Sequence, residues 1–302
     1  MQSEEKMETR KIDAHNHPDW HGHDLGKFLA NMDENGIEKC FLLTFLAPEE
    51  ESDPLALGAV HGALLGEKSV LSFSRSLSYM ERAPERFILG YAPDPRDREA
   101  CRKLIAARKI YGARLCGEIK FRTMYDSPDC LRLFHTAGEL GMPVTLHMQY
   151  DLQKRYTDAW GEWWGGSIHT LEHCLQECPE TVFLGHAPGF WIHISGDDLW
   201  KTKTYPAPTD PVLPGGEIPR LLRTYPNLYC DISSGSGYEA LTRDRQFTKK
   251  FLLEFQDRVL FARDYFDHIH EDLIESLELP ESVKEKIYFG NARKLVPPEQ
   301  PA

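Results

Sequence analysis

Histidine and carboxylate side chains recur in this sequence at places where short apolar runs come to an end. The stretch KIDAHNHPDWHGHD, residues 11–24, brings four histidines within nine positions. Imidazole and carboxylate groups are the ligands that Zn²⁺ and similar divalent metals prefer in proteins. Because the other groups of this kind lie far along the chain, a metal site would have to be assembled from several segments. The candidates are His15, His17, Glu118, Lys120, His147, His186 and Asp264.

His15 and His17 form the nearest pair of candidate ligands. Residues at i and i+2 of a strand point to the same face, so both imidazoles can face one metal. A His-x-His pair alone is a weak signal, but His147 and Asp264 at the ends of other runs would complete a set of three nitrogens and one oxygen. The remaining histidines of residues 11–24 follow the run in a predicted loop and are expected at the rim of the site: His21 and His23.

Eight short apolar runs predict the strands that must position these groups. They are nearly continuous in apolar character, as in strands that are buried on both faces of a parallel sheet. The candidate ligands lie at or near the ends of these runs. The runs cover residues 10–17, 37–45, 86–93, 113–121, 142–148, 181–188, 227–235 and 258–266.

The segments between the runs favour helices. Residues 97–112 carry acidic residues early and basic residues late, and Gly112 marks the end. Residues 127–143 open with Ser127 as the expected N-cap. Residues 271–295 predict two short helices at the end of the chain.

Strict alternation of strands and helices predicts an α/β fold with a parallel sheet, and eight units close naturally into a single (β/α)8 TIM barrel. We expect one domain, residues 1–302, with the metal site at the C-terminal ends of the strands. An open doubly wound sheet is the alternative. No glycine-rich phosphate loop follows the first run, which argues against it.

Composition excludes several classes of partner. The formal charge of −12 argues against nucleic acid or an anionic membrane as the main partner, and 41% hydrophobic residues suffice for a large core. The seven cysteines form no CxxC pair and are expected to be free thiols in a reducing compartment. The start MQSEEKMETRK lacks the apolar core of a signal peptide, so we expect a cytoplasmic protein that binds a small molecule.

Five ordered motifs carry a resemblance that spans nearly the whole chain. They are IDAHNHP (12–18), PVTLHM (143–148), FLGHAPG (183–189), VLFARDYF (259–266) and FGNARKL (289–295). With them the sequence resembles the amidohydrolase superfamily, most closely the amidohydrolase-related (amidohydrolase 2) branch, which also contains aminocarboxymuconate-semialdehyde decarboxylase and related decarboxylases and hydratases.

The resemblance implies roles for the residues that match these motifs. His15, His17, His147 and Asp264 match positions of metal ligands. His186 matches a histidine that binds a second metal in binuclear members and acts in acid–base or electrostatic roles in mononuclear ones. The sequence departs from the pattern at two positions beside Asp264. The first is Arg263, which should point outward and pair under a helix, and the second is Phe266, where a proline often follows.

The fourth run leaves three alternatives open. Glu118 and Lys120 share a face of the strand, so both can point into the barrel. They can form an ion pair at the mouth, or Glu118 can bind a metal. The resemblance adds a bridge between two metals, formed by Glu118 or by a carboxylated Lys120.

Two long segments, 149–167 and 188–216, show no clear periodicity and favour binding loops or lids. They hold five of the six tryptophans. Aromatic side chains there would build a dry substrate pocket or a contact in a homo-oligomer. Besides Lys120, the expected substrate-binding residues are Trp163, Trp164 and Trp191.

These observations favour a metal-dependent hydrolase of a small amide, ester or lactone. One or two divalent ions, zinc or alternatively manganese, would lower the pKa of a bound water from about 15.7 towards 7. Asp264 would accept the proton of that water, and the metal or His186 would polarise the carbonyl group. A decarboxylase or hydratase of a small unsaturated carboxylic acid is one alternative. A non-catalytic metal-binding protein is the other.

Overall fold

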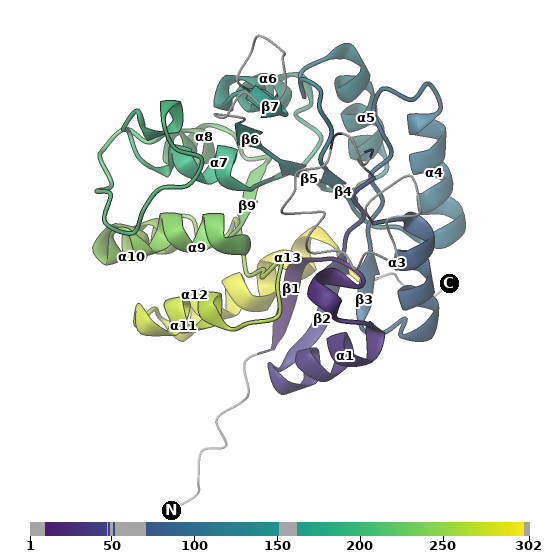
Figure 1. Ribbon diagram of the computed structural model, residues 1–302, viewed down its shortest axis with the longest axis horizontal. Coiled ribbons are helices and arrows are strands. Elements are labelled where there is room, and N and C mark those ends of the chain that lie inside the picture. The colour runs from purple at the N-terminus through teal and green to yellow at the C-terminus, as the bar shows by residue number, and fades with distance from the viewer. Residues whose placement is uncertain (1–9, 47, 49–50, 52–70, 151–161, 299–302) are drawn as a thin grey trace, which may run out of the picture.

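The strands of the computed structural model form an eight-stranded parallel barrel (Figure 1). The structure describes residues 10–298 apart from 47, 49–50, 52–70 and 151–161. Each barrel strand lies within one of the eight predicted runs. The strands are β1 (Lys11–Asn16), β2 (Ile37–Leu42), β3 (Phe87–Leu89), β4 (Cys116–Ile119), β5 (Val144–His147), β8 (Phe183–His186), β9 (Leu228–Asp231) and β10 (Val259–Leu260).

Two sheets join at both edges to close the barrel. One sheet has the order β1-β2-β3 and the other β10-β9-β8-β5-β4. A parallel bridge between Gly90 and Leu115 connects β3 to β4. On the other side, the amide of Ala14 donates to the carbonyl oxygen of Phe261 at 3.0 Å. The predicted (β/α)8 barrel is therefore confirmed, and the open doubly wound sheet is wrong.

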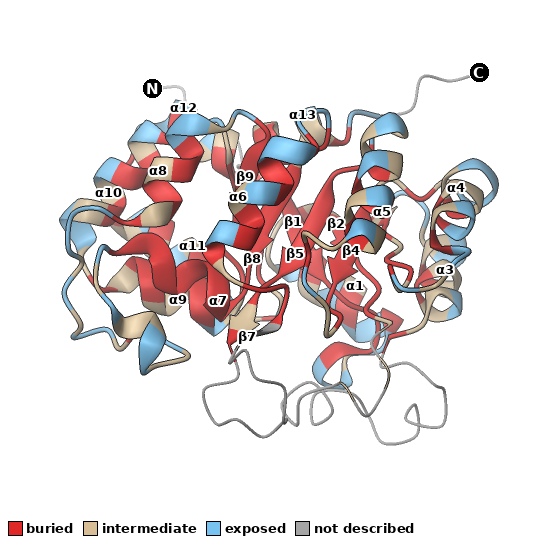
Figure 2. Cartoon of the chain, turned by 90° about the horizontal axis from the view of Figure 1, so that it is seen from above, coloured by how far each residue is buried: buried red, intermediate tan, exposed pale blue. Residues whose placement is uncertain are grey.

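Helices surround the strands, with their exposed sides turned outward (Figure 2). Ser127 Oγ accepts the amide of Cys130 at the start of one helix, and Gly112 ends another with a φ of 70°, as predicted. The longer helices are α1 (Leu25–Glu34), α3 (Phe73–Arg82), α4 (Ala100–Tyr111), α5 (Pro128–Glu139), α6 (Ile168–Glu177), α8 (Glu217–Thr224), α9 (Ser234–Thr242), α10 (Arg245–Glu254) and α11 (Ile269–Ser276).

Three predicted segments differ in detail. Helix α11 begins two residues before the expected 271, and the segment that follows runs as α12 (Glu281–Glu285), a π-helical turn (Lys286–Gly290) and α13 (Asn291–Leu295). Segment 149–167 is not a plain loop, because β6 (Gln149–Tyr150) pairs with β7 (Glu162–Trp164). Segment 188–216 contains short helical turns: α7 (Pro188–Trp191), η4 (Ile192–Ile194) and η5 (Leu199–Lys201).

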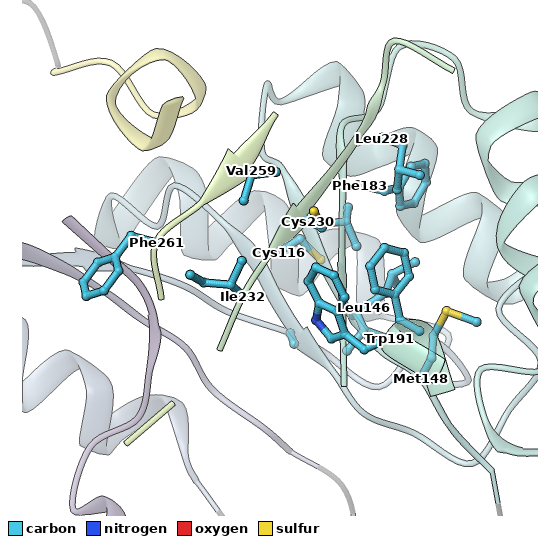
Figure 3. Close-up of a cluster of buried hydrophobic side chains, with 14 of the residues drawn as sticks. Cys116, Leu146, Met148, Phe183, Trp191, Leu228, Cys230, Ile232, Val259 and Phe261 are labelled. Atoms are coloured by element: carbon cyan, nitrogen blue, oxygen red, sulfur yellow. The ribbon is translucent and has the colours of Figure 1, made fainter. Parts of the chain in front are cut away.

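Two clusters of apolar side chains build the core. The smaller cluster includes Ile12, Leu184 and Leu260 from three barrel strands, so it fills the barrel interior. The larger cluster packs the outer faces of the strands against the helices, and Figure 3 shows part of it. All seven cysteines are free thiols, as predicted. Among the described helices, none is both long and apolar enough to span a membrane.

A buried ion pair ties the first strand to the last. Asp13 accepts the backbone amide of Arg263 at 2.9 Å and its Nε at 2.9 Å. The guanidinium also donates to Asn31 of α1 at 2.8 Å, so Arg263 is paired under a helix, as predicted. Both side chains of the pair are at most 1% exposed. The pair lies two residues before His15 and one before Asp264, so it fixes the two chain segments that carry these candidate ligands.

Candidate metal centre

The barrel brings all seven candidate groups to one end of the strands. Six of them are buried, and Asp264 is half-buried. They come from the ends of β1, β4, β5 and β8 and from the segment after β10. The seven are His15, His17, Glu118, Lys120, His147, His186 and Asp264.

Glu118 lies at the centre of this group. Its Oε2 is 3.8 Å from Nε2 of His15 and 3.5 Å from Nε2 of His17. Its Oε1 is 2.6 Å from Nδ1 of His147 and 3.5 Å from Nε2 of His186. Each carboxylate oxygen thus faces two imidazoles, an arrangement that the sequence left open.

Hydrogen bonds at Nδ1 aim three of these rings inward. Nδ1 of His17 lies 3.0 Å from the carbonyl oxygen of Leu43. Nδ1 of His15 and Nδ1 of His186 lie 3.0 and 3.1 Å from the carboxylate of Asp231. Because these oxygens can only accept, each Nδ1 carries a hydrogen, and Nε2 is the ring atom that is left to bind a metal.

Asp231 was missed by sequence reasoning. It ends β9, within the predicted run 227–235, and is fully buried. The signal was present, because a carboxylate at the end of a barrel strand is the same feature that identified the other candidates.

Among the seven candidate side chains, two buried atoms have no hydrogen-bond partner in the described part of the chain: Nε2 of His15 and Oδ1 of Asp264. Buried polar atoms are nearly always paired, so such atoms indicate a missing ligand. Oδ1 of Asp264 lies 3.6 Å from Nε2 of His17. Ligand atoms about 2.1 Å from a tetrahedral ion lie about 3.4 Å from one another. The ligand atoms of His15, His17 and Glu118 all lie within 4.8 Å of one another, which fits a divalent cation, and Asp264 lies beside His17.

The placement of His147 differs from the predicted ligand set. We expected it beside His15, His17 and Asp264, but its Nδ1 faces the other oxygen of Glu118. Together with Glu118 and His186 it forms a second group of close ligand atoms, all within 4.8 Å of one another. The strand order explains the difference, because β5 lies between β4 and β8, on the far side of Glu118 from β1.

Burial and neighbouring charges set the protonation of the group. Burial lowers the pKa of His17 to about 3 and that of His147 to about 4, so both rings are neutral at pH 7. Burial also opposes charge on His15, but Asp231 and Glu118 raise its pKa well above the usual value. Burial raises the pKa of Asp264 to about 6. Despite burial, His147 and His15 hold the pKa of Glu118 well below its usual value.

Metal binding is expected to release a proton from His15. Its raised pKa keeps the ring protonated at pH 7 in metal-free protein, and a metal at Nε2 must displace that proton. Titration calorimetry with Zn²⁺ in two buffers of different ionisation enthalpy should show release of about one proton per chain. His23→Gln, at the rim, is the control and should leave the release unchanged. Equal heats in the two buffers would contradict the expectation.

The predicted substrate residues have different environments. Nζ of Lys120 lies 4.6 Å from the ring centroid of Phe45 and 5.9 Å from that of Trp164. The Trp164 ring also contacts His147 edge-on at 6.5 Å. Lys120 and Trp164 therefore form part of the wall beside the metal-ligating groups. The side chain of Trp163 lies outside the described residues, as does the whole of Trp160.

Trp191 does not fit the predicted role in substrate binding. Its ring is fully buried in the larger apolar cluster (Figure 3), edge-on to Phe251 of α10, and Nε1 donates to the carbonyl oxygen of Asp231 at 3.1 Å. Pro188 opens the short helix α7, which turns this ring into the core. Trp191 thus packs on the outer side of the barrel and is hydrogen-bonded to the end of β9.

His21 and His23 lie outside the group of candidate ligands, as predicted. The ring of His21 contacts Tyr265 edge-on at 4.5 Å, and that of His23 stacks on Phe266 at 3.7 Å. The two histidines therefore pack the loop after β1 against the loop after β10. Phe266 is buried in this contact, at the position where relatives often have a proline nearby.

Hydrogen bonds of its backbone amide and carbonyl group fix the position of Asp264. Its φ of 51° lies in the left-handed region, its amide donates to the carbonyl oxygen of His15 at 2.9 Å, and its carbonyl oxygen accepts Nε1 of Trp20 at 2.9 Å. The Trp20 ring contacts His17 edge-on at 5.1 Å. Both backbone bonds of Asp264 thus go to the segment that carries His15 and His17.

Comparison with known proteins gives a family and a fold. The model of the family Amidohydro_2, described as amidohydrolase, matches residues 12–297. No curated protein matches the sequence well enough to count as a relative.

Three solved structures illustrate the similarity of fold. A dihydroxybenzoic acid decarboxylase from Polaromonas sp. JS666, with bound manganese and the inhibitor 2-nitroresorcinol, is 19% identical with a TM-score of 0.60, covering 96% of this chain and 97% of its own. 2,6-Dihydroxybenzoate decarboxylase from Rhizobium is 17% identical with a TM-score of 0.58, and the match covers 95% of this chain and 98% of that protein. A probable 2-pyrone-4,6-dicarboxylic acid hydrolase from Acinetobacter baumannii, with citric acid bound, is 12% identical with a TM-score of 0.56, covering 95% and 98%. At these identities the similarity shows the barrel fold alone.

Proposed function

The chain belongs to the amidohydrolase family, whose members are metal-dependent enzymes, and we propose that it is a single-domain hydrolase of a small amide, ester or lactone. The position of Glu118 carries this proposal. Its Oε2 faces His15 and His17, and its Oε1 faces His147 and His186. A carboxylate between two groups of ligands suits the bridging position between two divalent ions, as in two-metal hydrolases.

Each ion would have its own ligands. His15, His17 and Asp264 would hold one ion with Oε2 of Glu118, and the second would lie between His147, His186 and Oε1. We propose zinc, because imidazole and carboxylate at tetrahedral spacing suit it, with manganese as the alternative. When bound, such ions act as Lewis acids and lower the pKa of water from about 15.7 towards 7.

The protein groups would move the proton and hold the substrate. Asp264 would hold the ion through Oδ1, and its other carboxylate oxygen would accept the proton of the attacking water. The same carboxyl group then protonates the leaving group. His186, held through Nδ1 by Asp231, would keep the second ion where its charge can polarise the substrate carbonyl. Lys120 and Trp164 bind the rest of the substrate from the neighbouring wall.

A decarboxylase or hydratase of an unsaturated carboxylic acid is the second candidate. Two of the similar structures are named as decarboxylases, and one of these contains manganese. In this reaction Asp264 and His186 would transfer protons to and from carbon, and the Lys120 ammonium would attract the substrate carboxylate.

Metal analysis and a substrate panel test the proposal together. We expect two ions per chain by elemental analysis, and Glu118→Gln should reduce this to at most one. Glu139→Gln, on α5, is the matched control. A panel of lactones, esters and amides should reveal hydrolysis that a chelator abolishes and Zn²⁺ or Mn²⁺ restores. One ion per chain, with carbon dioxide released from aromatic carboxylic acids, would favour the lyase. A folded protein that takes up no divalent metal would contradict both.

A further inference from the structure

Asp231 contacts two candidate ligands that belong to different metal positions. Its Oδ2 is 3.0 Å from Nδ1 of His15, and its Oδ1 is 3.1 Å from Nδ1 of His186. The two histidines come from β1 and β8, which β9 and β10 separate in the barrel. The two imidazoles lie beside each other, with centroids 4.2 Å apart. One carboxylate therefore connects ligands from separate parts of the barrel.

The Asp231 carboxylate is itself held in place. Oδ1 accepts the amide of Ser233 at 3.2 Å and its hydroxyl at 2.5 Å. The backbone carbonyl oxygen of Asp231 accepts Nε1 of Trp191 at 3.1 Å, and the side chain is fully buried. These contacts leave the carboxylate in one orientation, with one oxygen for each histidine.

We infer that Asp231 is a positioning residue shared by both metal positions. A carboxylate can only accept at these contacts, so both Nδ1 atoms carry hydrogen and both Nε2 atoms face Glu118, at 3.8 and 3.5 Å. His15 belongs to the group around Oε2 of Glu118, and His186 to the group around Oε1. The affinity for both ions thus depends on the same carboxylate. This inference rests on the proposed two-metal function.

Asp231 also lies close enough to both rings to form a ligand group with them. The contacts argue for hydrogen bonds instead, because 3.0 and 3.1 Å are typical N–H···O distances. A metal bound at the Nδ1 atoms would also leave the Nε2 atoms facing Glu118 without an ion. Carboxylate groups behind metal-binding histidines commonly fix the ring in this way.

Zinc affinity in matched variants tests the inference. Asp231→Asn keeps the size of the side chain but offers one acceptor oxygen instead of two, so it should weaken binding of at least one ion by about 10–100-fold in competition with a chelator. Asp231→Ala offers no acceptor and should weaken binding of both ions. Glu139→Gln makes the same carboxylate-to-amide change at an exposed position of α5, outside the cluster, and should bind zinc as wild type does. Unchanged binding of both ions in Asp231→Asn, or weakening of only one ion in Asp231→Ala, would overturn the inference.

A spectroscopic measurement on the unsubstituted protein keeps the test valid if Asp231→Asn fails to fold. In zinc-loaded protein with ¹⁵N-labelled histidine, Nδ1–H of His15 and of His186 should give low-field proton signals protected from exchange. Where the variant folds, both signals should shift or vanish together, while Nδ1–H of His17, bonded to the carbonyl oxygen of Leu43, stays as the internal reference. A zinc-loaded wild type without these two signals would contradict the inference.

The two proposals fail in different ways. A folded wild-type protein that binds no zinc would end the proposed function. A wild type with two zinc ions, and an Asp231→Asn variant that holds both equally tightly, would end only the inference about Asp231.

Discussion

Asp264→Asn is expected to lower kcat by about 10²–10⁴-fold while the barrel stays folded. The amide has nearly the same shape as the carboxylate but cannot accept a proton at neutral pH. Oδ1 of Asp264 is buried without a hydrogen-bond partner among the described residues and lies 3.6 Å from Nε2 of His17, so the carboxylate is available for the role of base in the proposed reaction. The backbone bonds to His15 and Trp20 do not involve the carboxylate, so the loop should keep its conformation. Steady-state kinetics on the substrate from the panel, with metal content and urea unfolding, would measure this.

The dependence of zinc affinity on pH provides a second test of Asp264→Asn. Burial raises the pKa of Asp264 to about 6, so the base is ionised above this pH and protonated below it. In wild type, zinc affinity should therefore fall as the pH drops through about 6, because the carboxylate must lose its proton to bind the ion, and this fall should be shallower in the variant. Asp272→Asn changes an exposed carboxylate of α11 and is the control. Turnover near the wild-type rate in Asp264→Asn would rule out the proposed base.

Asp13→Ala is expected to destabilise the protein by about 3–5 kcal/mol. The substitution leaves the Arg263 guanidinium, 1% exposed, without its carboxylate. It also removes the acceptor of the Arg263 amide, which helps to hold the segment before Asp264 to β1. Urea unfolding of the metal-free protein would measure the loss, and the metal content should fall as well, because both segments carry candidate ligands.

A surface ion pair and a double variant provide the controls. Glu38→Gln removes an ion pair with the exposed Arg10 and should cost at most about 1 kcal/mol. Replacing both members of the buried pair, as Asp13→Leu with Arg263→Met, should restore much of the stability, because no uncompensated charge remains. If Asp13→Ala cost no more than Glu38→Gln, the buried pair would not be what holds the first and last strands together.

The barrel could be predicted from sequence because its strands are buried on both faces. Such strands give continuous apolar runs, and each polar residue at a run's end is then conspicuous, as His147 and His186 were. The central position of Glu118 could not be predicted. Glu118 and Lys120 share a face, and only the distances between strands decide which of them meets the imidazoles.

Two features of the site depend on tertiary contacts that the sequence does not show. Trp191 was expected in a binding loop because segment 188–216 shows no periodicity, but its burial depends on Phe251, which is 60 positions later in the sequence. The orientation of His147 was not predicted, because strand order around a barrel does not say which oxygen of a neighbouring carboxylate a ring will face. Contacts of this kind are not encoded in local patterns.

The Asp13–Arg263 pair that joins the first and last strands can form only late in the synthesis of the chain. Asp13 and Arg263 are 250 positions apart. At 5–20 residues per second, the first strand waits roughly 12–50 s on the ribosome before its partner has been made. By then Glu118, His147 and His186 have also been made, and Asp264 is the last candidate ligand to be added. The full set of candidate ligands is therefore present only when translation is nearly complete, and the barrel can close only then.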